Sequence, residues 1–185
     1  MDSIDISVRD GLTLRSWQLT EAADLFSLVD GNRAHLQQWL SWVPQVSTVA
    51  DSEDFIRRSI EEREKNEGCE LGIWYHDSLA GCIGLHELNR VHKKTSIGYW
   101  LGTRFVGKGL MTNAVKALTT YCFTTLELNR VEIRCCPENE KSLAIPRRLW
   151  FKKEGTLRQA ELVNGEFLDN TVFSMLKKDW LTSTV

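Results

Sequence analysis

The sequence predicts an α/β (α+β) domain in which a mixed, mostly antiparallel sheet of about six or seven strands is flanked by helices. Three observations carry this prediction. In segments 70–76, 79–88 and 95–102, apolar residues either alternate with polar ones or form continuous stretches, and turn residues separate the segments, as expected for successive strands. Residues 110–126 carry an apolar stripe at helical spacing. A final hairpin is indicated by an Asn164-Gly165 turn.

Composition limits the protein to one ordinary core. The chain has 185 residues, of which 42% are hydrophobic and 26% charged, so we expect a single domain over residues 1–185. A net charge of −2 with both signs dispersed gives no case for direct binding of nucleic acid or of an anionic membrane. The N-terminus lacks the apolar core of a signal peptide, and no apolar run approaches the roughly 20 residues that span a bilayer, so we expect a cytoplasmic protein.

Cysteine and histidine spacing argues against a metal centre. The five cysteines form no C-x-x-C pair and leave one over in any full pairing, and the four histidines are scattered. We therefore expect neither a zinc site nor a disulfide framework.

The first third of the chain reads as mostly helical. A short strand is predicted near 12–15, followed by helices from about residue 20 and over 33–40. Pro44 breaks the chain, and Asp51 is predicted to cap a third helix that ends near Gly68.

The middle and the end supply the remaining elements. After the three strands and the helix over 110–126, residues 130–136 (RVEIRCC) alternate as a strand. A helix is expected over 140–149, where Pro146 should delay or kink it because proline lacks an N–H. The terminal hairpin follows.

Residues 102–110, GTRFVGKGL, come close to a nucleotide-binding P-loop. Gly109 stands where that loop needs a hydroxyl for Mg²⁺, and the strand over 130–136 ends without the expected Asp, so an NTPase is disfavoured. A strand, Gly-x-Gly and an amphipathic helix nevertheless form an anion site, because backbone N–H groups and the helix N-terminus point to one place. A tight turn without a ligand is the alternative that Gly-x-Gly alone would favour.

Three motifs in order resemble the GNAT family of acetyl-CoA-dependent N-acetyltransferases: VGKGLM before a helix, RVEIRCC, and NEKSLAIPRRLWF. The family's phosphate loop reads [RQ]-G-x-G-x-[GA], and its later motif is N-x-x-S followed by L-G-F. Further stretches near 14–43, 96–102 and 154–176 look like the RimJ/RimL branch, which acetylates N-termini of ribosomal proteins. The resemblance covers Leu12 to Trp180.

The chain departs from the family pattern at several positions. Val106 replaces Arg or Gln, Met111 replaces Gly or Ala, and Trp150 replaces the Gly of L-G-F. The family's tyrosine acid is absent from the helix over 140–149, which moves the acid role elsewhere.

The resemblance implies acetyl-CoA as cosubstrate and no metal. Backbone groups of the loop would hold the pyrophosphate, with Lys108 acting through its N–H; the implied residues are Val106, Gly107, Lys108, Gly109, Leu110, Met111 and Thr112. The strands over 95–102 and 130–136 would splay apart, and backbone groups near Trp100 and Leu101 would bind the pantetheine arm. Asn139 would hold the pantetheine amide or cap the following helix.

The implied chemistry needs a base and a group for the leaving thiolate. An α-amino group with a pKa near ~8 must lose a proton, and Glu161 is our choice of base, with Glu87 as runner-up and a solvated strand carboxylate as the alternative. Ser142 would protonate the thiolate or hold it by a hydrogen bond, unless it only caps a helix. Cys135 is expected to line the site near the thioester and not to carry the acyl group.

We therefore expect transfer of an acetyl group to a primary amine by direct attack in a ternary complex, with the N-terminal α-amino group of a protein, possibly ribosomal, as acceptor. The alternatives are a non-catalytic CoA-binding module and a small-amine (polyamine or aminoglycoside) acetyltransferase, which would need an acidic cleft formed by residues such as Glu61, Glu62 and Glu64. Trp39, Trp42 and Trp100 could line the acceptor cleft, although packing is favoured for each. A homodimer or higher homo-oligomer would match the RimJ/RimL branch.

Overall fold

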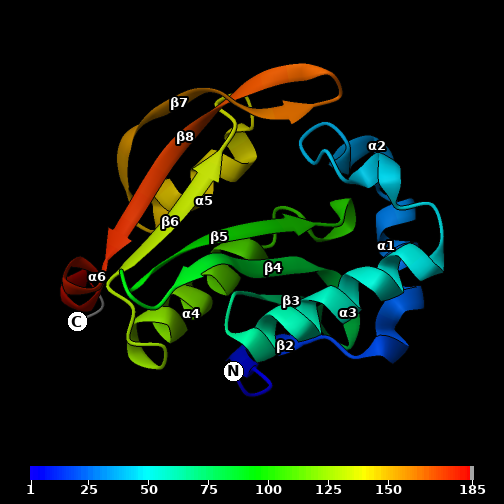
Figure 1. Ribbon diagram of the computed structural model, residues 1–185, viewed down its shortest axis with the longest axis horizontal. Coiled ribbons are helices and arrows are strands. Elements are labelled where there is room, and N and C mark those ends of the chain that lie inside the picture. The colour runs from blue at the N-terminus through cyan, green and yellow to red at the C-terminus, as the bar shows by residue number, and fades with distance from the viewer. Residues whose placement is uncertain (184–185) are drawn as a thin grey trace.

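One eight-stranded sheet organises the protein. The computed structural model describes residues 1–183, and the strand order is β1-β2-β3-β4-β5-β6-β8-β7. All neighbouring strands are antiparallel except β5 and β6, which are parallel (Figure 1). The predicted fold class is confirmed, with one strand more than the six or seven expected. The single domain expected for 1–185 includes residues 184 and 185, which lie outside the described residues.

The elements follow the predicted order. The strands are β1 Asp5–Arg9, β2 Leu12–Ser16, β3 Cys69–Tyr75, β4 Ser78–Asn89, β5 Lys94–Leu101, β6 Arg130–Cys135, β7 Lys152–Val163 and β8 Glu166–Leu176. The α-helices are α1 Ala22–Asp30, α2 Arg33–Leu36, α3 Val49–Lys65, α4 Leu110–Thr124, α5 Glu140–Arg148 and α6 Lys177–Ser183. Short 3-10 turns lie at Leu19–Glu21, Val43–Gln45 and Thr103–Phe105.

The additional strand is β1, at the edge of the sheet. It pairs with β2 through a turn in which Gly11 adopts a φ of 67°, a left-handed conformation that glycine enters at low cost. Ile6 and Val8 alternate with polar residues, which is a strand pattern, but an edge strand leaves even its apolar side half-exposed. The sequence of this hairpin therefore gives only a weak strand signal.

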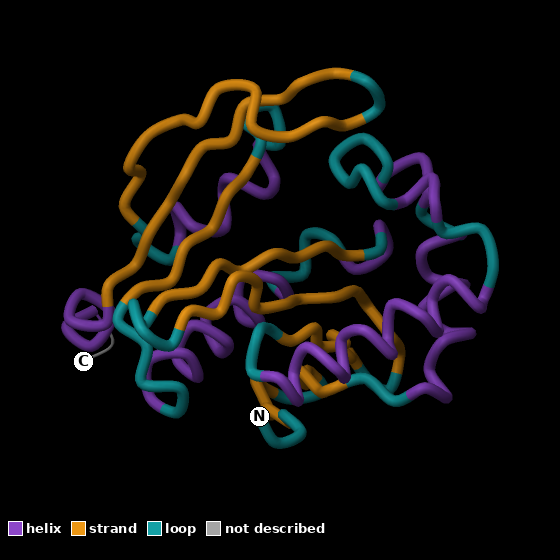
Figure 2. Tube along the Cα trace, viewed as in Figure 1, coloured by secondary structure: helices purple, strands orange, loops and turns teal. Residues whose placement is uncertain are grey.

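Two apolar cores lie on opposite faces of the sheet (Figure 2). On one face α4 packs under β1, β2, β5 and β6, and fully buried Leu118 and Phe123 come from this helix. On the other face α1 packs on β4 and α3 packs on β3, around Trp17, Trp74 and Ile56. No helix within residues 1–183 combines the length and the apolarity that a bilayer crossing requires.

The predicted cap of the third helix was wrong by three residues. Thr48 is the N-cap of α3, and its hydroxyl accepts a hydrogen bond from the Asp51 N–H at 3.3 Å. The Asp51 carboxylate accepts in return from the backbone N–H of Thr48 at 2.8 Å, which completes a capping box. The backbone N–H of Ser47, together with the hydroxyl and N–H of Thr48, lowers the pKa of Asp51 to about 2.

Pro146 lies inside α5 and does not delay the helix, which begins at Glu140. An α-helix normally bonds the N–H of each residue to the carbonyl four positions earlier. Because proline has no N–H, the carbonyl of Ser142 lacks that partner. This vacancy becomes important in the candidate site.

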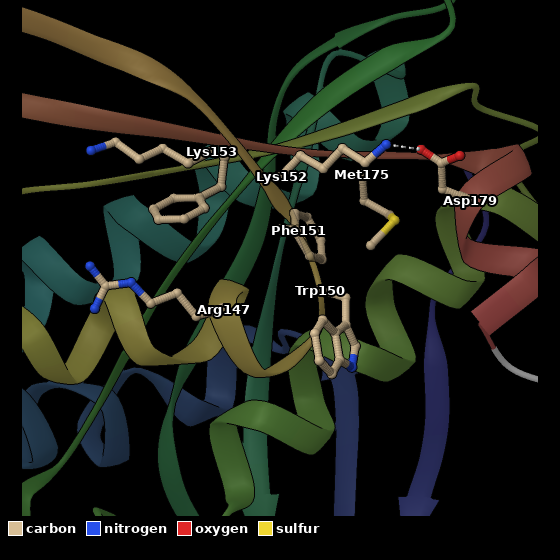
Figure 3. A pocket seen from close by; sticks show the side chains of 8 residues that line it. Arg147, Trp150, Phe151, Lys152, Lys153, Met175 and Asp179 are labelled. Carbon is tan, nitrogen blue, oxygen red and sulfur yellow. Dashed lines mark ion pairs between the residues drawn. The ribbon is translucent and has the colours of Figure 1, made fainter.

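Trp150 ends α5 in a conformation that usually belongs to glycine. The N–H of Trp150 donates to the Arg147 carbonyl and that of Phe151 to the Pro146 carbonyl, the two bonds of a Schellman motif. Trp150 has a φ of 61°, and 79% of it is exposed, beside a pocket that Arg147, Lys152 and Lys153 also line (Figure 3). The indole therefore gains little from packing while its backbone is strained.

Replacing this tryptophan by glycine should stabilise the protein. Trp150→Gly removes a left-handed penalty of roughly 1 kcal/mol for a residue with a Cβ, which for a chain of this size raises Tm by about 2–4 °C. Trp150→Ala is the matched control, since it removes the indole but keeps the Cβ, and its Tm should not rise. Scanning calorimetry of the three proteins measures both effects. A Tm for Trp150→Gly below that of the unaltered protein would show that the exposed indole contributes more than the strain costs.

Candidate functional site

The sheet opens between β5 and β6. Their parallel pairing covers only Lys94–Ser96 against Arg130–Glu132, although β5 continues to Leu101 and β6 to Cys135. The predicted splay of these two strands is therefore confirmed. Trp100 and Leu101 lie on the open part of β5, where the opposite edge of that strand is paired with Cys82 and Gly81 of β4. Backbone polar groups on the open edges have no partner in the other strand, so an extended ligand can hydrogen-bond there.

The glycine loop lies beside this opening and leads directly into α4. Gly107 has a φ of 82° and Gly109 one of 73°, and Gly109 is the N-cap of α4. The first turn of a helix leaves its N–H groups without helical partners, which here applies to Leu110, Met111 and Thr112. These donors and the positive end of the helix fit a pyrophosphate group.

Val106 and Lys108 differ in what they offer an anion. The Val106 N–H donates to the Thr103 carbonyl at 3.2 Å and is not a free donor. The Lys108 ammonium lies 5.7 Å from the ring centroid of Phe105 and 5.9 Å from that of Tyr75, and the Lys108 carbonyl accepts from Arg9 at 3.2 Å. These contacts leave the Lys108 N–H, rather than its side chain, as the group for an anion.

Asn139, Ser142 and Cys135 come together where α5 begins beside the end of β6. Asn139 is the N-cap of α5, and its side-chain oxygen accepts from the Ser142 N–H at 3.2 Å. The capping alternative thus describes Asn139 and not Ser142. The Ser142 hydroxyl instead lies 3.2 Å from the sulfur of Cys135, whose thiol has a pKa raised by burial.

Tyr99 of β5 joins this cluster from across the opening. Its hydroxyl donates to the Ser142 carbonyl at 3.1 Å and accepts from the Ser142 hydroxyl at 3.4 Å. Pro146 has no N–H, so this carbonyl has no helical donor four residues later. Burial raises the pKa of Tyr99 well above its usual value, so the phenol keeps its proton at neutral pH. Sequence reasoning missed Tyr99, since nothing in the strand pattern shows that it reaches a helix some forty residues later.

Glu161 lies on the opposite face of the sheet, near the same opening. A register shift between Leu157 and Glu161 bends β7, and the half-buried Glu161 accepts from the side-chain amide of Asn170 at 3.1 Å. Asn170 precedes Thr171, which pairs with Cys135 in β6. Because side chains alternate along a strand, Asn170 and Glu161 lie on the face that also carries Arg134.

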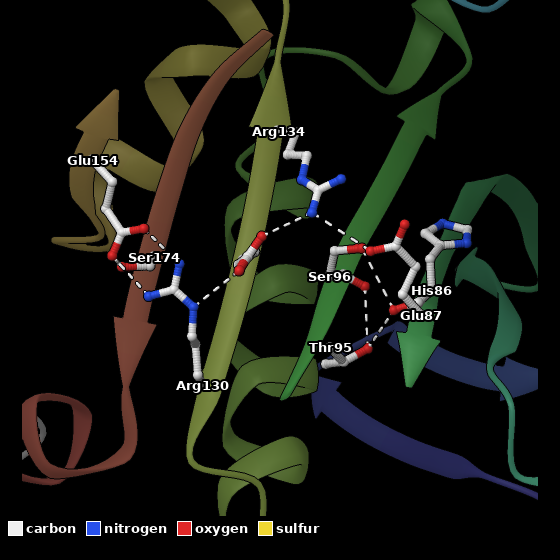
Figure 4. A network of polar contacts seen from close by, with 9 residues as sticks. His86, Glu87, Thr95, Ser96, Arg130, Arg134, Glu154 and Ser174 are labelled. Atoms are coloured by element: carbon white, nitrogen blue, oxygen red, sulfur yellow. Dashed lines mark hydrogen bonds and ion pairs between the residues drawn. The ribbon is translucent and has the colours of Figure 1, made fainter. Parts of the chain in front are cut away.

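Arginine side chains form ion pairs with two other carboxylates of this face, Glu87 and Glu132 (Figure 4). Arg134 lies 3.5 Å from Glu87, the runner-up base, and 3.0 Å from Glu132, while Arg130 binds Glu132 at 2.9 Å. Burial opposes ionisation of Glu132, but the hydrogen bonds from the two arginines lower its pKa overall. Glu87 is therefore ion-paired and 69% exposed, whereas Glu161 is bound by a neutral amide.

A pair of a mostly buried carboxylate and an exposed histidine on the same face was also missed. Glu70 of β3 is 16% exposed and lies 3.5 Å from His86 of β4, while the Cys82 thiol donates to it at 3.1 Å. Burial raises the pKa of Glu70. Its carboxylate lies over Gly84, and His86 lies over Gly98, where an added methyl group would come within 2.6 Å of its Nε2. Only the strand register brings these residues together, so the sequence carries no signal for the pair.

The remaining candidates have ordinary structural surroundings. Trp42 packs on Trp100 with ring centroids 6.0 Å apart, and Trp39 is half-buried. Glu61, Glu62 and Glu64 have exposed side chains on α3, and Glu61 lies 3.9 Å from Lys65. In the part of the chain that the structure describes, no three His, Cys, Asp or Glu side chains lie close enough to hold a metal ion.

Known acetyltransferases are similar to this chain in sequence and fold. A family model described as "Acetyltransferase (GNAT) domain" matches residues 11–152. YdaF of Bacillus subtilis, a candidate ribosomal N-acetyltransferase, is 38% identical over 177 residues, which cover 94% of this chain and 95% of that protein.

Two solved structures are similar over nearly the whole chain. RimL, an α-N-acetyltransferase of a ribosomal protein, was solved with coenzyme A; its TM-score is 0.91 at 28% identity, covering 95% of this chain and 99% of the other. The microcin C7 self-immunity acetyltransferase MccE, solved with acetyl-CoA and AMP, has a TM-score of 0.89 at 32% identity, with coverage of 92% and 95%. With a family model over most of its length and these relatives at high coverage, the chain belongs to the GNAT family of acetyltransferases.

Proposed function

We propose that this acetyltransferase moves an acetyl group from acetyl-CoA to the N-terminal α-amino group of a protein, and that ribosomal proteins are among its acceptors. The opening between β5 and β6 carries the proposal, because it has a phosphate loop on its α4 side and an available carboxylate, Glu161, on the other face. The similarity to YdaF and RimL supports the choice of acceptor.

The donor side is formed by backbone groups. The loop from Gly107 to Thr112 binds the pyrophosphate through N–H groups, and the open edge of β5 at Trp100 and Leu101 binds the pantetheine arm as an added strand would. When bound, acetyl-CoA supplies an activated thioester. An N–H of the β5 edge then stabilises the negative charge that develops on the thioester oxygen.

The acceptor side requires a base. An α-ammonium group with a pKa near ~8 is mostly charged at neutral pH, and Glu161 removes its proton directly or through water. The neutral amine attacks the acetyl carbon, a C–N bond forms, and the C–S bond breaks with its electron pair on sulfur. The acylated nitrogen then loses its second proton, which reaches the thiolate through water, so the products are the acetamide and the free thiol of coenzyme A. Ser142, at the end of the opening, donates a hydrogen bond to that sulfur.

The other expectations from the sequence stay predictions. A polyamine or aminoglycoside acceptor would need concentrated negative charge, but Glu61, Glu62 and Glu64 are exposed on α3 and the Glu87 and Glu132 carboxylates are paired with Arg134. A homo-oligomer, a cytoplasmic location and a single domain over 1–185 are likewise untested.

Free-thiol release from acetyl-CoA tests the acceptor. We expect release with peptides that have a free N-terminus, and mass spectrometry should place the acetyl group on the α-nitrogen. Matched peptides with a blocked N-terminus and an internal lysine, together with spermidine and an aminoglycoside, are the controls. Modification of lysine or of small amines alone would overturn the acceptor. A protein that binds acetyl-CoA but modifies no amine would instead be a non-catalytic CoA-binding module.

Glu161→Gln tests the base. Loss of a general base costs on the order of 10²-fold or more in rate, so kcat should fall by at least that factor while the Kd for coenzyme A is unchanged. Glu87→Gln is the matched control, and its kcat should stay within about threefold, because Arg134 already binds that carboxylate. Steady-state kinetics and calorimetric titration give the two quantities. If Glu87→Gln lost more activity than Glu161→Gln, the base would have to be reassigned.

A further inference from the structure

We propose that Tyr99 is a positioning residue for Ser142 and that Pro146 makes this possible by leaving the Ser142 carbonyl free. The inference rests on the role proposed for Ser142 at the leaving sulfur. It concerns the two hydrogen bonds between Tyr99 and Ser142, which link β5 to α5 across the opening of the sheet.

Pro146 interrupts the hydrogen-bond pattern of α5. In an uninterrupted helix the N–H of residue 146 would occupy the Ser142 carbonyl. Pro146 has no N–H, and the buried phenol of Tyr99 donates to that carbonyl at 3.1 Å instead. The proline therefore turns an ordinary helical carbonyl into an anchor for a side chain on another element.

The two hydrogen bonds between Tyr99 and Ser142 run in opposite directions. Since the Tyr99 proton lies toward the carbonyl, its oxygen is left to accept from the Ser142 hydroxyl at 3.4 Å. The sulfur of Cys135 lies 3.2 Å from the same hydroxyl and 3.8 Å from the hydroxyl of Tyr99, so the three groups form a triangle. Ser142 is thus held between Tyr99 and Cys135, and its rotamer is fixed before a substrate enters.

Tyr99 positions Ser142 and does not act as an acid. Burial strengthens the hold of Tyr99 on its proton, and that proton already has an acceptor. When sulfur gains its electron pair, the Ser142 O–H turns from Tyr99 to the sulfur, while Tyr99 keeps both its proton and its bond to the carbonyl. No proton leaves the tyrosine, so Tyr99 acts only by fixing where the Ser142 oxygen lies.

A double-mutant cycle tests this role. A lost hydrogen bond of about 0.5–1.5 kcal/mol corresponds to roughly 2- to 13-fold, so Tyr99→Phe should lower kcat by about that factor, with KM and Kd for acetyl-CoA unchanged. In a Ser142→Ala background the same change should cost nothing further. A Tyr99→Phe loss of the same size in both backgrounds, or none in either, would overturn the proposal.

Pro146→Ala separates the loss of the Tyr99 hydrogen bond from a loss of stability. Alanine supplies an N–H that can bond the Ser142 carbonyl, and it favours the helix, so Tm should be equal or higher while this N–H competes with Tyr99 for the carbonyl. We expect kcat to fall although Tyr99 and Ser142 are both present. Unaltered kcat in Pro146→Ala would contradict the inference.

The cycle is run with whichever amine the acceptor panel identifies, so a lysine or small-amine acceptor changes the proposed function without affecting this test. If no amine is accepted, the same variants are compared by the slow release of thiol from acetyl-CoA to water. The same pattern of losses is expected there, and equal rates in all variants would overturn the inference separately from the function.

Discussion

The end of the β5–β6 pairing is the constraint on which the rest of the structure depends. Beyond Ser96 and Glu132 the two parallel strands separate, and each presents a backbone edge that the other does not satisfy. Unpaired backbone groups are costly away from water, so such edges demand either solvent or an extended ligand. α4 follows β5 and α5 follows β6, so the N-termini of both helices lie beside this one opening (Figure 1). An anion site and a cluster of polar side chains are thereby placed at the same gap.

The groups that we assign to the acetyl donor and to the amine lie on opposite faces of the sheet. On the α4 and α5 side, the loop at Gly107 and Gly109 and the cluster of Tyr99, Cys135 and Ser142 face the donor. On the other side, the carboxylates form pairs with arginines, and Glu161 is the one we assign to the amine. In the proposed mechanism, proton removal by Glu161 and thiolate stabilisation by Ser142 therefore take place on opposite faces of the sheet. The opening is the passage through which the two substrates meet.

How far the sequence predicts this arrangement depends on the range of the interaction. Local signals succeeded: Gly-x-Gly before an apolar stripe predicted the loop and α4, and the alternation of residues 130–136 predicted β6. Local signals also misled, as at Asp51, where two polar residues three apart could each cap the helix and the reciprocal pair with Thr48 decided. The sequence did not predict the side-chain contacts between distant strands and helices. Tyr99, Asn170 and the Glu70–His86 pair become visible only once register fixes which residues face each other.

Hydrogen exchange of backbone amides, with and without coenzyme A, tests the central claim most directly. The open edge of β5 and the loop before α4 should both gain partners, so exchange should slow at residues 97–101 and 107–112 together. Amides of α3, which packs on β3 on the other face of the sheet, should exchange at unchanged rates. Slowing confined to another surface, such as the pocket around Arg147 and Trp150, would contradict the account, because the opening between β5 and β6 would then not be where the donor binds.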